Sequence, residues 1–545
     1  MQEFGIRLKK AIKDVYDLDI DPEFSPAPEN IDADYSSNVA LKLAKIVHKA
    51  PINIAGELCS QLGDASATMP GFINFSLQDE YLCQQIRELS YDFDKNISSD
   101  EYRDQTIVCE FSDPNPFKVL HVGHLYTSVV GDSISRLFEY AGAKVIRANF
   151  GGDVGLHVAK TLYVLEQKSL KDFDIEDIAR CYVEGTAAYE DDEKAHDKIT
   201  EINKEIYRIN QKNDHATKLA ELYWRGRELS YGYFKDFYAE IGVKFDKFYP
   251  ESTVTEMGVQ KVKEELGRGV YEMSQGAVIF NGDKYGLHTR VFINKEGIPT
   301  YETKDVGLIL TKWEDYHFDK SVVITGNEQL DYMKVVLKSV EQYAPELVEK
   351  TSHLTHGLVK LPGNVKMSSR KGNFLKAVDV LNMIKDELKK SYESSDNAVA
   401  LAATKYAFLK YKMGGNIVFD PHESVKMTGN SGPYLLYSAV RAKKILQKSS
   451  GDSGQSDAAY DDNERKLAKK ILEYKDVLKE AVVEMAPHKV ANYLYELAQE
   501  FSRFYEQCTV AGSDREAIRV QIVEVYLKTV THGLGILGIS IPDEM

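Results

Sequence analysis

The stretch between residues 106 and 150 constrains the fold more than any other part of the chain. A short apolar segment, TIVCEF (106–111), is followed by a loop rich in Pro and Asn and then by a helix expected from about His124. A second apolar segment, KVIRANF (144–150), leads into the glycine-containing turn GGDVG. Strand, loop, helix and strand within about 45 residues make a βαβ unit, and such a unit requires a parallel sheet.

Further strand-like segments continue this pattern at residues 277–280, 288–293 and 321–326. We therefore expect a doubly wound, Rossmann-like α/β domain over residues 101–390. A charged helical segment at about 160–245 interrupts it, with an apolar stripe formed by Ile199, Ile202, Ile206 and Ile209. Such a stripe is typical of helices packed on a core, so we interpret this segment as a helical insertion. A direct chemical role for it is the less favoured alternative.

The two flanking regions have a different character. Residues 1–100 contain an amphipathic helical stretch and the alternating segment GFINFSL (71–77), which predict a small α+β module. The polar run at 92–105 is interpreted as a linker. After residue 391 long amphipathic runs dominate, so residues 391–545 are expected to form an all-α helical bundle.

Composition narrows the class of protein. The 545 residues include 43% hydrophobic and 28% charged residues, which excludes a disordered or fibrous chain. No apolar run approaches the roughly 18 residues of a membrane span, and the N-terminus lacks the apolar core of a signal peptide. The five cysteines are scattered and never spaced as C-x-x-C. This pattern favours a reducing compartment, so we expect a cytoplasmic protein without a structural zinc site or any other protein-held metal.

Charge leaves the choice of partner open. Acidic residues outnumber basic ones by 84 to 68, giving a net charge of −16. A nucleic-acid partner is not excluded, because a large protein can carry a local basic groove within an acidic whole.

The tetrad His121-Val122-Gly123-His124 lies at the predicted strand–loop–helix junction. Glycine allows the backbone to approach a ligand closely, and the N–H groups and dipole of a helix N-terminus attract phosphate. The imidazoles can add hydrogen bonds, so the tetrad predicts a nucleoside triphosphate site. Two histidines packed at a turn are the structural alternative, and small nucleotidyltransferases carry the same tetrad.

A basic segment, KMSSRKG (366–372), follows about 245 residues later. Its three cations and two hydroxyls can close over a triphosphate and stabilise charge on a pyrophosphate leaving group. Alone, it is equally well a basic surface loop. At the far end of the domain that carries the tetrad, it indicates a site that activates a substrate with a nucleotide.

Together the two motifs resemble the signature motifs of class I aminoacyl-tRNA synthetases. The surrounding segments EFSDPNPFKVLHVGHL and KVIRANFGGDVG are similar to those of arginyl-tRNA synthetases in particular. The resemblance extends over essentially the whole chain. NVALKLAKIV and PGFINFSL resemble that family's N-terminal module, which touches the tRNA elbow. GNSGPYLLYSAVRAKKIL and the C-terminal GLGILGISIPDEM resemble its helical anticodon-binding domain.

The resemblance implies an activity. Such an enzyme activates L-arginine with ATP to arginyl-adenylate, releases pyrophosphate, and transfers arginine to the 3′-terminal ribose of tRNA(Arg). It implies that tRNA is needed for the activation step and that Mg²⁺ accompanies ATP. No segment of the sequence indicates a surface for self-assembly, so we expect a monomer.

The resemblance also assigns residues to roles. The catalytic positions are Lys118, His121, Gly123, His124, Lys366 and Lys371. The same residues, with Met367 and Ser368, form the ATP-binding set. The arginine-binding positions are Glu110, Asn115, Asn149, Glu251, Tyr301, Asp305 and Gln329. Because a planar guanidinium prefers carboxylates in bidentate geometry, Glu251 and Asp305 are expected to clamp it, with Tyr301 positioning it.

For tRNA, the expected contacts are Tyr434, Tyr437, Lys443, Lys444 and Tyr505. Exposed aromatic rings suit splayed RNA bases, whereas half-buried core tyrosines are the alternative.

Three departures from the family pattern accompany these assignments. Ser369 occupies the second lysine position of the Lys-Met-Ser-Lys-Ser motif, and Lys118, three residues before His121, could take its part. Asp113 stands where the family usually has serine. Val154 and the pair Leu156-His157 replace the usual Trp and Thr-Gln after GGD.

Two alternative functions remain open. One is a class I synthetase for another amino acid, although the cysteine pattern disfavours a cysteinyl enzyme. The other is a non-catalytic tRNA-binding paralogue, against which the intact His121, His124 and Lys366 argue.

Overall fold

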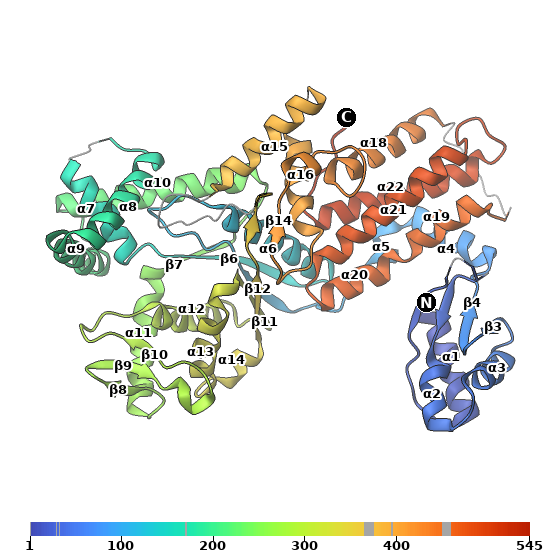
Figure 1. The fold of residues 1–545 in the computed structure, drawn as a ribbon, viewed down its shortest axis with the longest axis horizontal. Coiled ribbons are helices and arrows are strands. Elements are labelled where there is room, and N and C mark those ends of the chain that lie inside the picture. The colour runs from blue at the N-terminus through green and yellow to red at the C-terminus, as the bar shows by residue number, and fades with distance from the viewer. Residues whose placement is uncertain are drawn as a thin grey trace.

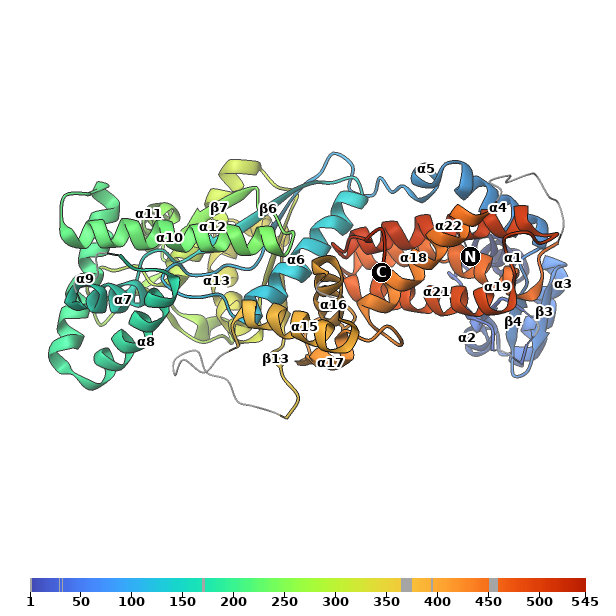
Figure 2. The ribbon, with the colours of Figure 1, turned by 90° about the horizontal axis from the view of Figure 1, so that it is seen from above.

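The computed structural model describes residues 2–545 apart from residues 29, 32, 169–171, 364–374, 394–395 and 450–458. An α/β lobe lies at one end of the molecule, a helical bundle adjoins it, and a small N-terminal lobe packs beneath the far end of the bundle (Figure 1). Helix α6 (Val122–Tyr140) lies where the α/β lobe meets the bundle (Figure 2). The predicted fold class is confirmed: a parallel α/β sheet stands between an α+β module and a helical bundle.

The N-terminal lobe packs three helices on an antiparallel sheet of order β1-β2-β4-β3. The helices are α1 (Gln2–Tyr16), α2 (Val39–Val47) and α3 (Pro51–Leu62). The strands are β1 (Phe24–Pro26), β2 (Tyr35–Ser37), β3 (Ala65–Thr68) and β4 (Phe72–Phe75). The apolar faces meet in one core, whose fully buried members include Leu8, Leu43 and Ile54.

The polar run after this lobe contains more structure than a linker. Helices α4 (Asp79–Tyr91) and α5 (Phe93–Ile97) connect the lobe to the rest of the chain. Asp92 caps α5 by accepting a hydrogen bond from the Lys95 amide, and Phe93 and Ile97 are buried in the main core. The prediction of a plain linker over 92–105 is therefore wrong for its first part, because two well-spaced apolar residues suffice to bury one helical turn.

The α/β lobe is built on a five-stranded parallel sheet of order β12-β11-β5-β6-β7. Its strands are β5 (Thr106–Glu110), β6 (Lys144–Gly151), β7 (Lys247–Pro250), β11 (Lys320–Gly326) and β12 (Thr351–His356). Helix α6 connects β5 to β6, as expected. Most residues of α6 from Val122 to Phe138 are buried on all faces of the helix, which explains why apolar residues occur all around it.

Two predicted strands belong elsewhere. Residues 277–280 and 288–293 provide β9 (Ala277–Phe280) and β10 (Arg290–Ile293), which pair antiparallel in a separate sheet with β8 (Glu272–Ser274). A parallel pair needs a crossover of a dozen or more residues, and the connection between β9 and β10 is too short for one.

Helices surround the parallel sheet. The predicted insertion is helical and consists of α7 (Leu156–Lys168), α8 (Ile175–Asp191), α9 (Glu193–Lys212) and α10 (Lys218–Glu240). Its four stripe isoleucines are all buried. The remaining helices of the lobe are α11 (Glu251–Gly267), α12 (Tyr301–Tyr316), α13 (Leu330–Glu341) and α14 (Pro345–Glu349), with the short 3-10 turns η1 (Gly282–Tyr285) and η2 (Asn327–Gln329).

The C-terminal part is the predicted helical bundle. Its helices are α15 (Ala377–Tyr392), α16 (Asn397–Leu409), α17 (Pro421–Ser424), α18 (Gly432–Lys448), α19 (Asp462–Leu472), α20 (Tyr474–Val483), α21 (Pro487–Gln507) and α22 (Glu516–Ile536). Strands β13 (Val359–Lys360) and β14 (Ile417–Val418) form a small parallel pair at its junction with the α/β lobe. One hydrophobic core runs from α6 into α22 without interruption, so the bundle is packed against α6. Within the described residues, no helix is both long and apolar enough to cross a membrane.

Candidate active site

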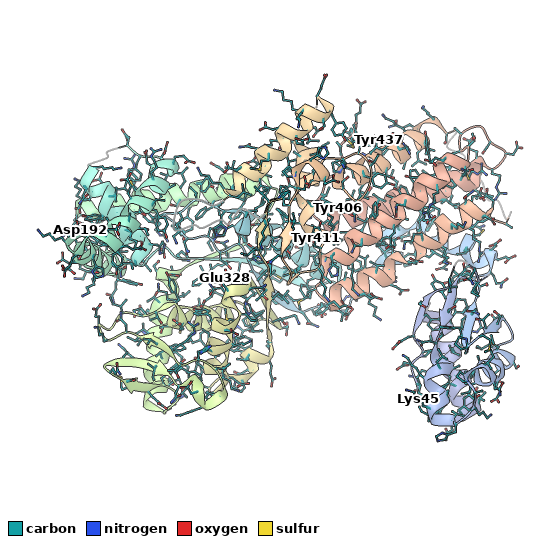
Figure 3. All side chains as sticks on the ribbon, in the orientation of Figure 1. Lys45, Asp192, Glu328, Tyr406, Tyr411 and Tyr437 are labelled. Atoms are coloured by element: carbon teal, nitrogen blue, oxygen red, sulfur yellow. The ribbon has the colours of Figure 1, made fainter. Side chains whose placement is uncertain are left out.

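The carboxyl ends of the parallel strands bring most of the predicted site residues to one edge of the sheet. Strand β5 ends at Glu110, β7 is followed directly by Glu251, and β11 is followed by the turn that holds Gln329. The strand order reverses between β5 and β11, which is where open α/β sheets bind ligands. In Figure 3, Glu328, next to Gln329, lies within the α/β lobe, to the left of the bundle.

The histidine tetrad forms the N-terminus of α6. The Gly123 amide donates to Nδ1 of His121, and the His121 amide donates to Nδ1 of His124, each at 3.1 Å. The two rings stack with centroids 3.8 Å apart. Because both Nδ1 atoms accept hydrogen bonds, each neutral ring carries its proton on Nε2. A Cβ at Gly123 would lie 2.9 Å from the His121 ring, so only glycine fits between the two histidines.

Both imidazoles are kept neutral. Burial, together with the neighbouring Lys118 and His356, lowers the pKa of His121 to about 4. The same causes hold the pKa of His124 well below its usual value. At neutral pH the tetrad is therefore a pair of uncharged hydrogen-bond donors at a helix N-terminus.

Lys118 is held by the helical insertion. Its ammonium lies 4.8 Å from the centroid of the Tyr182 ring in α8, a cation–π distance. This places a positive charge beside the histidine pair, where the sequence predicted a substitute for the missing lysine of the second motif.

The second motif itself, including Lys366, Met367, Ser368, Ser369 and Lys371, lies outside the described residues. The segment that follows it returns to the tetrad. The Val122 amide donates to the carbonyl of Leu375, and the Ala377 amide donates to that of Leu120, both at 2.9 Å. Leu375 and Ala377, which follow the basic segment in the chain, are thus bonded to the tetrad and its preceding residue.

The predicted guanidinium pocket contains two buried carboxylates. Oε2 of Glu251 accepts a hydrogen bond from Nζ of Lys304 at 2.5 Å, and both side chains are buried. Asp305 accepts a hydrogen bond from the Tyr332 hydroxyl. Burial raises the pKa of Asp305 to about 8, to which the nearby Glu110 and Glu251 contribute.

The residues expected at the rim of this pocket are differently placed. Tyr301 is half exposed and lies over Lys304, with the ammonium 4.9 Å from its ring centroid. Oδ1 of Asn115 accepts from the Gly152 amide at 2.8 Å, which fixes the turn after β6. Gln329 is exposed on η2.

Glu110 and Asn149, two of the predicted arginine-binding residues, are buried and have partners within the protein. Glu110 accepts from the buried Lys312 at 2.5 Å. Nδ2 of Asn149 donates at 3.3 Å both to the Phe111 carbonyl and to the Tyr238 hydroxyl. Asn149 thereby ties β6 to the loop after β5, and Glu110 ties the end of β5 to α12. Asp113 in that loop has a φ of 49° and accepts from the Phe150 amide, so the departure from serine adds a tie between β5 and β6.

Several residues of the pocket were not predicted from the sequence. Lys304 adjoins Asp305 in TYETKD, yet nothing in the sequence pairs it with Glu251. Tyr207 of the insertion helix α9 also faces the Lys304 ammonium, at 5.6 Å from the ring centroid. The insertion is packed on a core as predicted, and it also supplies tyrosines to the two site lysines. No sequence signal distinguished those tyrosines from the others in the insertion.

The expected tRNA contacts divide into two groups. Tyr437 and Tyr505 are about two-fifths exposed, at 40% and 43%, and the Arg441 guanidinium lies between their rings, 4.6 and 4.4 Å from the centroids. Tyr437 lies on the upper side of the bundle in Figure 3. Tyr434 is partly buried and bonds to the Ala498 carbonyl and to Ser502, which favours its structural alternative.

The two lysines also differ. Nζ of Lys443 lies 3.3 Å from the Pro542 carbonyl, so it ties down the C-terminal segment, whereas Lys444 is exposed.

Comparison with known proteins agrees with this geometry. Family models match residues 89–420 (tRNA synthetases class I (R), catalytic domain), 435–545 (DALR anticodon binding domain) and 3–77 (arginyl tRNA synthetase N terminal domain).

Relatives and solved structures extend the match over the whole chain. An arginine–tRNA ligase of Flavobacterium psychrophilum is 26% identical over 99% of this chain and 98% of its own. One from Clostridium botulinum is 28% identical over 92% of each. The arginyl-tRNA synthetase structures of Thermus thermophilus and Plasmodium falciparum superpose with TM-scores of 0.79 and 0.81, at 22% and 19% identity. Each superposition covers all of this chain, with 100% and 99% of the respective structures. With its catalytic-domain model matching well over half of the residues, the chain belongs to the arginyl-tRNA synthetases of class I.

Proposed function

We propose how this arginine–tRNA ligase uses its own residues to activate arginine. The observation that carries the proposal is the shared edge of the parallel sheet. It places two neutral imidazole donors and two buried carboxylates, Glu251 and Asp305, around the switch point between β5 and β11. One group suits the phosphates of ATP and the other suits a guanidinium.

In the activation step, the carboxylate of arginine attacks the α-phosphorus of ATP, and pyrophosphate leaves. No side-chain nucleophile is needed, since positioning and charge stabilisation suffice for phosphoryl-type transfers. The Nε2–H groups of His121 and His124 donate to the phosphates, and the glycine between them admits the phosphate chain to the amides of α6. Lys118 neutralises the negative charge that grows on the leaving group, together with Lys366 and Lys371 of the second motif. Met367 and Ser368 of the same motif complete the ATP-binding set.

Mg²⁺ fits this site as a companion of ATP. The side chains around the histidine pair, Lys118 and His356, offer only nitrogen atoms, whereas Mg²⁺ prefers oxygen ligands, so the phosphate oxygens would hold the ion. Its contribution when bound is to neutralise phosphate charge.

In the arginine pocket, Glu251 and Asp305 clamp the guanidinium and Tyr301 closes over it. Glu110 and Asn115 take the α-amino end, and Asn149 and Gln329 complete the pocket. The buried Asn149 also holds the loop that carries Asn115, through the Phe111 carbonyl. A pocket with two carboxylates suits a cation with several N–H donors better than any neutral amino-acid side chain.

After activation, the ribose of the terminal tRNA nucleotide attacks the adenylate carbonyl, and arginine is transferred. The exposed pair Tyr437 and Tyr505 with Arg441 between them supports base stacking at the anticodon end. Lys444 is placed to meet a phosphate, and Tyr434 and Lys443 support that surface from beneath.

We further propose that tRNA must bind before activation. The support is a direct connection from the bundle to the helix of the tetrad. Oγ of Ser133 in α6 donates to the Ile536 carbonyl at 2.9 Å, and Nη1 of Arg136 in α6 donates to the Gly535 carbonyl at 3.3 Å. A shift of α22 on tRNA binding would therefore reach α6.

The division of the chain follows from these roles. We propose a tRNA-elbow module over residues 1–100, a catalytic domain over 101–390 and an anticodon-binding domain over 391–545. The enzyme is proposed to act as a monomer. It is proposed to act in the cytoplasm, because its five free cysteines suit a reducing compartment.

Arginine-dependent exchange between pyrophosphate and ATP, measured with and without unfractionated tRNA, tests the function. Exchange that appears only with tRNA is the expected result. Exchange without tRNA would contradict the proposed order and leave the ligase assignment intact. No exchange with cognate-source tRNA, from folded protein that binds ATP, would point to another amino acid or to a non-catalytic tRNA-binding protein.

A further inference from the structure

A buried lysine already pairs with a carboxylate that the substrate arginine is expected to bind. Nζ of Lys304 lies 2.5 Å from Oε2 of Glu251, and the two residues are each 3% exposed. A guanidinium that binds a carboxylate in bidentate fashion uses both oxygens. Arginine and Lys304 therefore compete for Glu251, and the displaced ammonium requires another acceptor, because an unpaired buried charge is strongly unfavourable.

A second acceptor lies next to Lys304. Nε2 of His157 is 2.7 Å from the Gly152 carbonyl, and since a carbonyl only accepts, Nε2 carries the proton. Nδ1 of His157 is then an acceptor. It is buried and has no hydrogen-bond partner among the residues that the structure describes.

The glycine turn after β6 brings the two atoms together. A Cβ at Gly155 would lie 3.6 Å from Nδ1 of His157 and 4.0 Å from Nζ of Lys304. The φ of Gly155 is +122°, a conformation that suits glycine, and its missing side chain leaves space between the two atoms. A cation this near also lowers the pKa of His157, whose burial already keeps the ring neutral and able to accept.

We propose that Lys304 is an exchangeable internal cation: it pairs with Glu251 in the empty pocket and moves to Nδ1 of His157 when the guanidinium of arginine binds Glu251. His157 is thus a positioning residue that acts on the substrate through Lys304. The inference rests on the proposed arginine pocket and adds where the ammonium of Lys304 goes when arginine binds.

The exchange has a consequence for specificity. A single ammonium offers Glu251 no more than Lys304 already provides, so a lysine substrate gains nothing by displacing it. A guanidinium offers two parallel N–H donors. The pocket therefore favours arginine over other cationic amino acids before any step of the reaction.

A double-mutant cycle on the full-length protein tests the exchange. The dissociation constant of arginine is measured by calorimetry for the wild type, His157→Phe, Lys304→Met and the double variant. His157→Phe is expected to raise the constant about tenfold when Lys304 is present and less than twofold in the Lys304→Met background, where no displaced cation remains. His157→Phe also removes the hydrogen bond to the Gly152 carbonyl. This loss is the same with and without Lys304, so it cancels when the two effects of His157→Phe are compared. If Lys304→Met does not fold, Lys304→Gln supplies the neutral background.

Three further measurements separate exchange from a merely structural role. His157→Gln should restore arginine binding, since its amide can donate to the Gly152 carbonyl and accept from Lys304. His532→Phe removes another buried histidine, bonded to Tyr474 in the bundle, and should leave arginine binding unchanged. Without arginine, the shifts in unfolding midpoint caused by His157→Phe and by Lys304→Met should add up to the shift of the double variant. At saturating arginine the two shifts should not add up to it.

An equal effect of His157→Phe in both backgrounds, or no effect in either, would overturn the exchange. A wild type that binds no arginine at all would overturn the proposed function instead.

Discussion

At the scale of single residues, Asp305 makes arginine binding depend on pH. Its pKa is raised to about 8 by burial and by the nearby carboxylates of Glu110, Glu251 and Glu302, while the Tyr332 hydroxyl acts in the opposite direction. Below pH 8 the empty pocket therefore holds a protonated Asp305, and a guanidinium must expel that proton in order to form an ion pair. Arginine affinity should increase with pH, by up to about tenfold per unit, and level off above pH 8.

Calorimetric titration of arginine between pH 6 and 9 measures this dependence. Asp305→Asn should lose the slope and bind roughly a hundredfold more weakly at pH 8.5, because one buried charge partner is gone. An unchanged slope in this variant would assign the proton to another group, such as Asp113 or Glu251, whose pKa values are also raised by burial.

Lys118 carries a second prediction at this scale. Lys118→Met should lower the rate of adenylate formation about a hundredfold, as removal of one charge-stabilising donor does elsewhere, with little change in arginine binding. Lys160→Met is the matched control, because that lysine also lies over a tyrosine of the insertion, Tyr189, at 4.7 Å. Single-turnover formation of adenylate measures both. Equal losses in the two variants would indicate damage to the insertion and no role for Lys118 at the phosphates.

The sequence predicted residues for the site but not how they pair. The tetrad and the carboxylates were recognisable because each stands in a distinctive motif. The partnership of Glu251 with Lys304 spans 53 positions and depends on how α11 packs against α12, which no local pattern encodes. The deep placement of Glu110 likewise depends on Lys312, which is buried beneath the sheet.

At the scale of elements, the start of α6 combines folding with chemistry. His121 is the N-cap of this helix and shares a reciprocal capping arrangement with His124. His121→Asn keeps a good N-cap and removes the imidazole, whereas His121→Ala removes both. We expect His121→Ala to lower the free energy of unfolding by about 1 kcal/mol, and His121→Asn to change it by less than half of that.

Both variants should lose adenylation activity to a similar degree, since both lack the Nε2–H donor. Chemical denaturation measures stability, and pyrophosphate exchange measures activity. If activity followed stability across the two variants, the imidazole would serve only as a cap.

Secondary structure was predictable where apolar periodicity was strong. Strands β5, β6 and β11, the insertion helices and the bundle helices fall where the pattern placed them. Strands β7 and β12 were missed because KFYP and TSHLTH are short and polar, and they become strands through pairing with β6 and β11. The apolar residues of β9 and β10 share a core with β5, β6 and β11, so the pattern alone could not tell the two sheets apart. The assignment to the main sheet failed because the connection between β9 and β10 is too short for a parallel crossover.

At the scale of the whole molecule, the N-terminal lobe is fastened to the bundle by few contacts. Arg465 of α19 pairs with Asp34 at 2.6 Å and also with Asp79, and Lys469 pairs with Asp34 at 3.3 Å. Asp34 in turn accepts from the Leu77 amide at 2.7 Å, so one carboxylate links the lobe, its connector and the bundle. If the lobe meets the tRNA elbow while the bundle meets the anticodon, this link sets the distance between two tRNA contacts, and their combined affinity depends on it.

Loosening the link should therefore weaken tRNA binding without altering the chemistry. Arg465→Met is expected to raise the KM for tRNA roughly three- to tenfold, because the second contact loses effective concentration when the lobe is free to turn. The KM values for arginine and ATP at saturating tRNA, and kcat, should stay within twofold. Arg268→Met is the control for loss of one positive charge, since Arg268 pairs with Glu264 and Glu265 of its own helix in the α/β lobe. A tRNA KM that rises equally in both variants would mean that net charge, rather than the placement of the lobe, governs tRNA affinity.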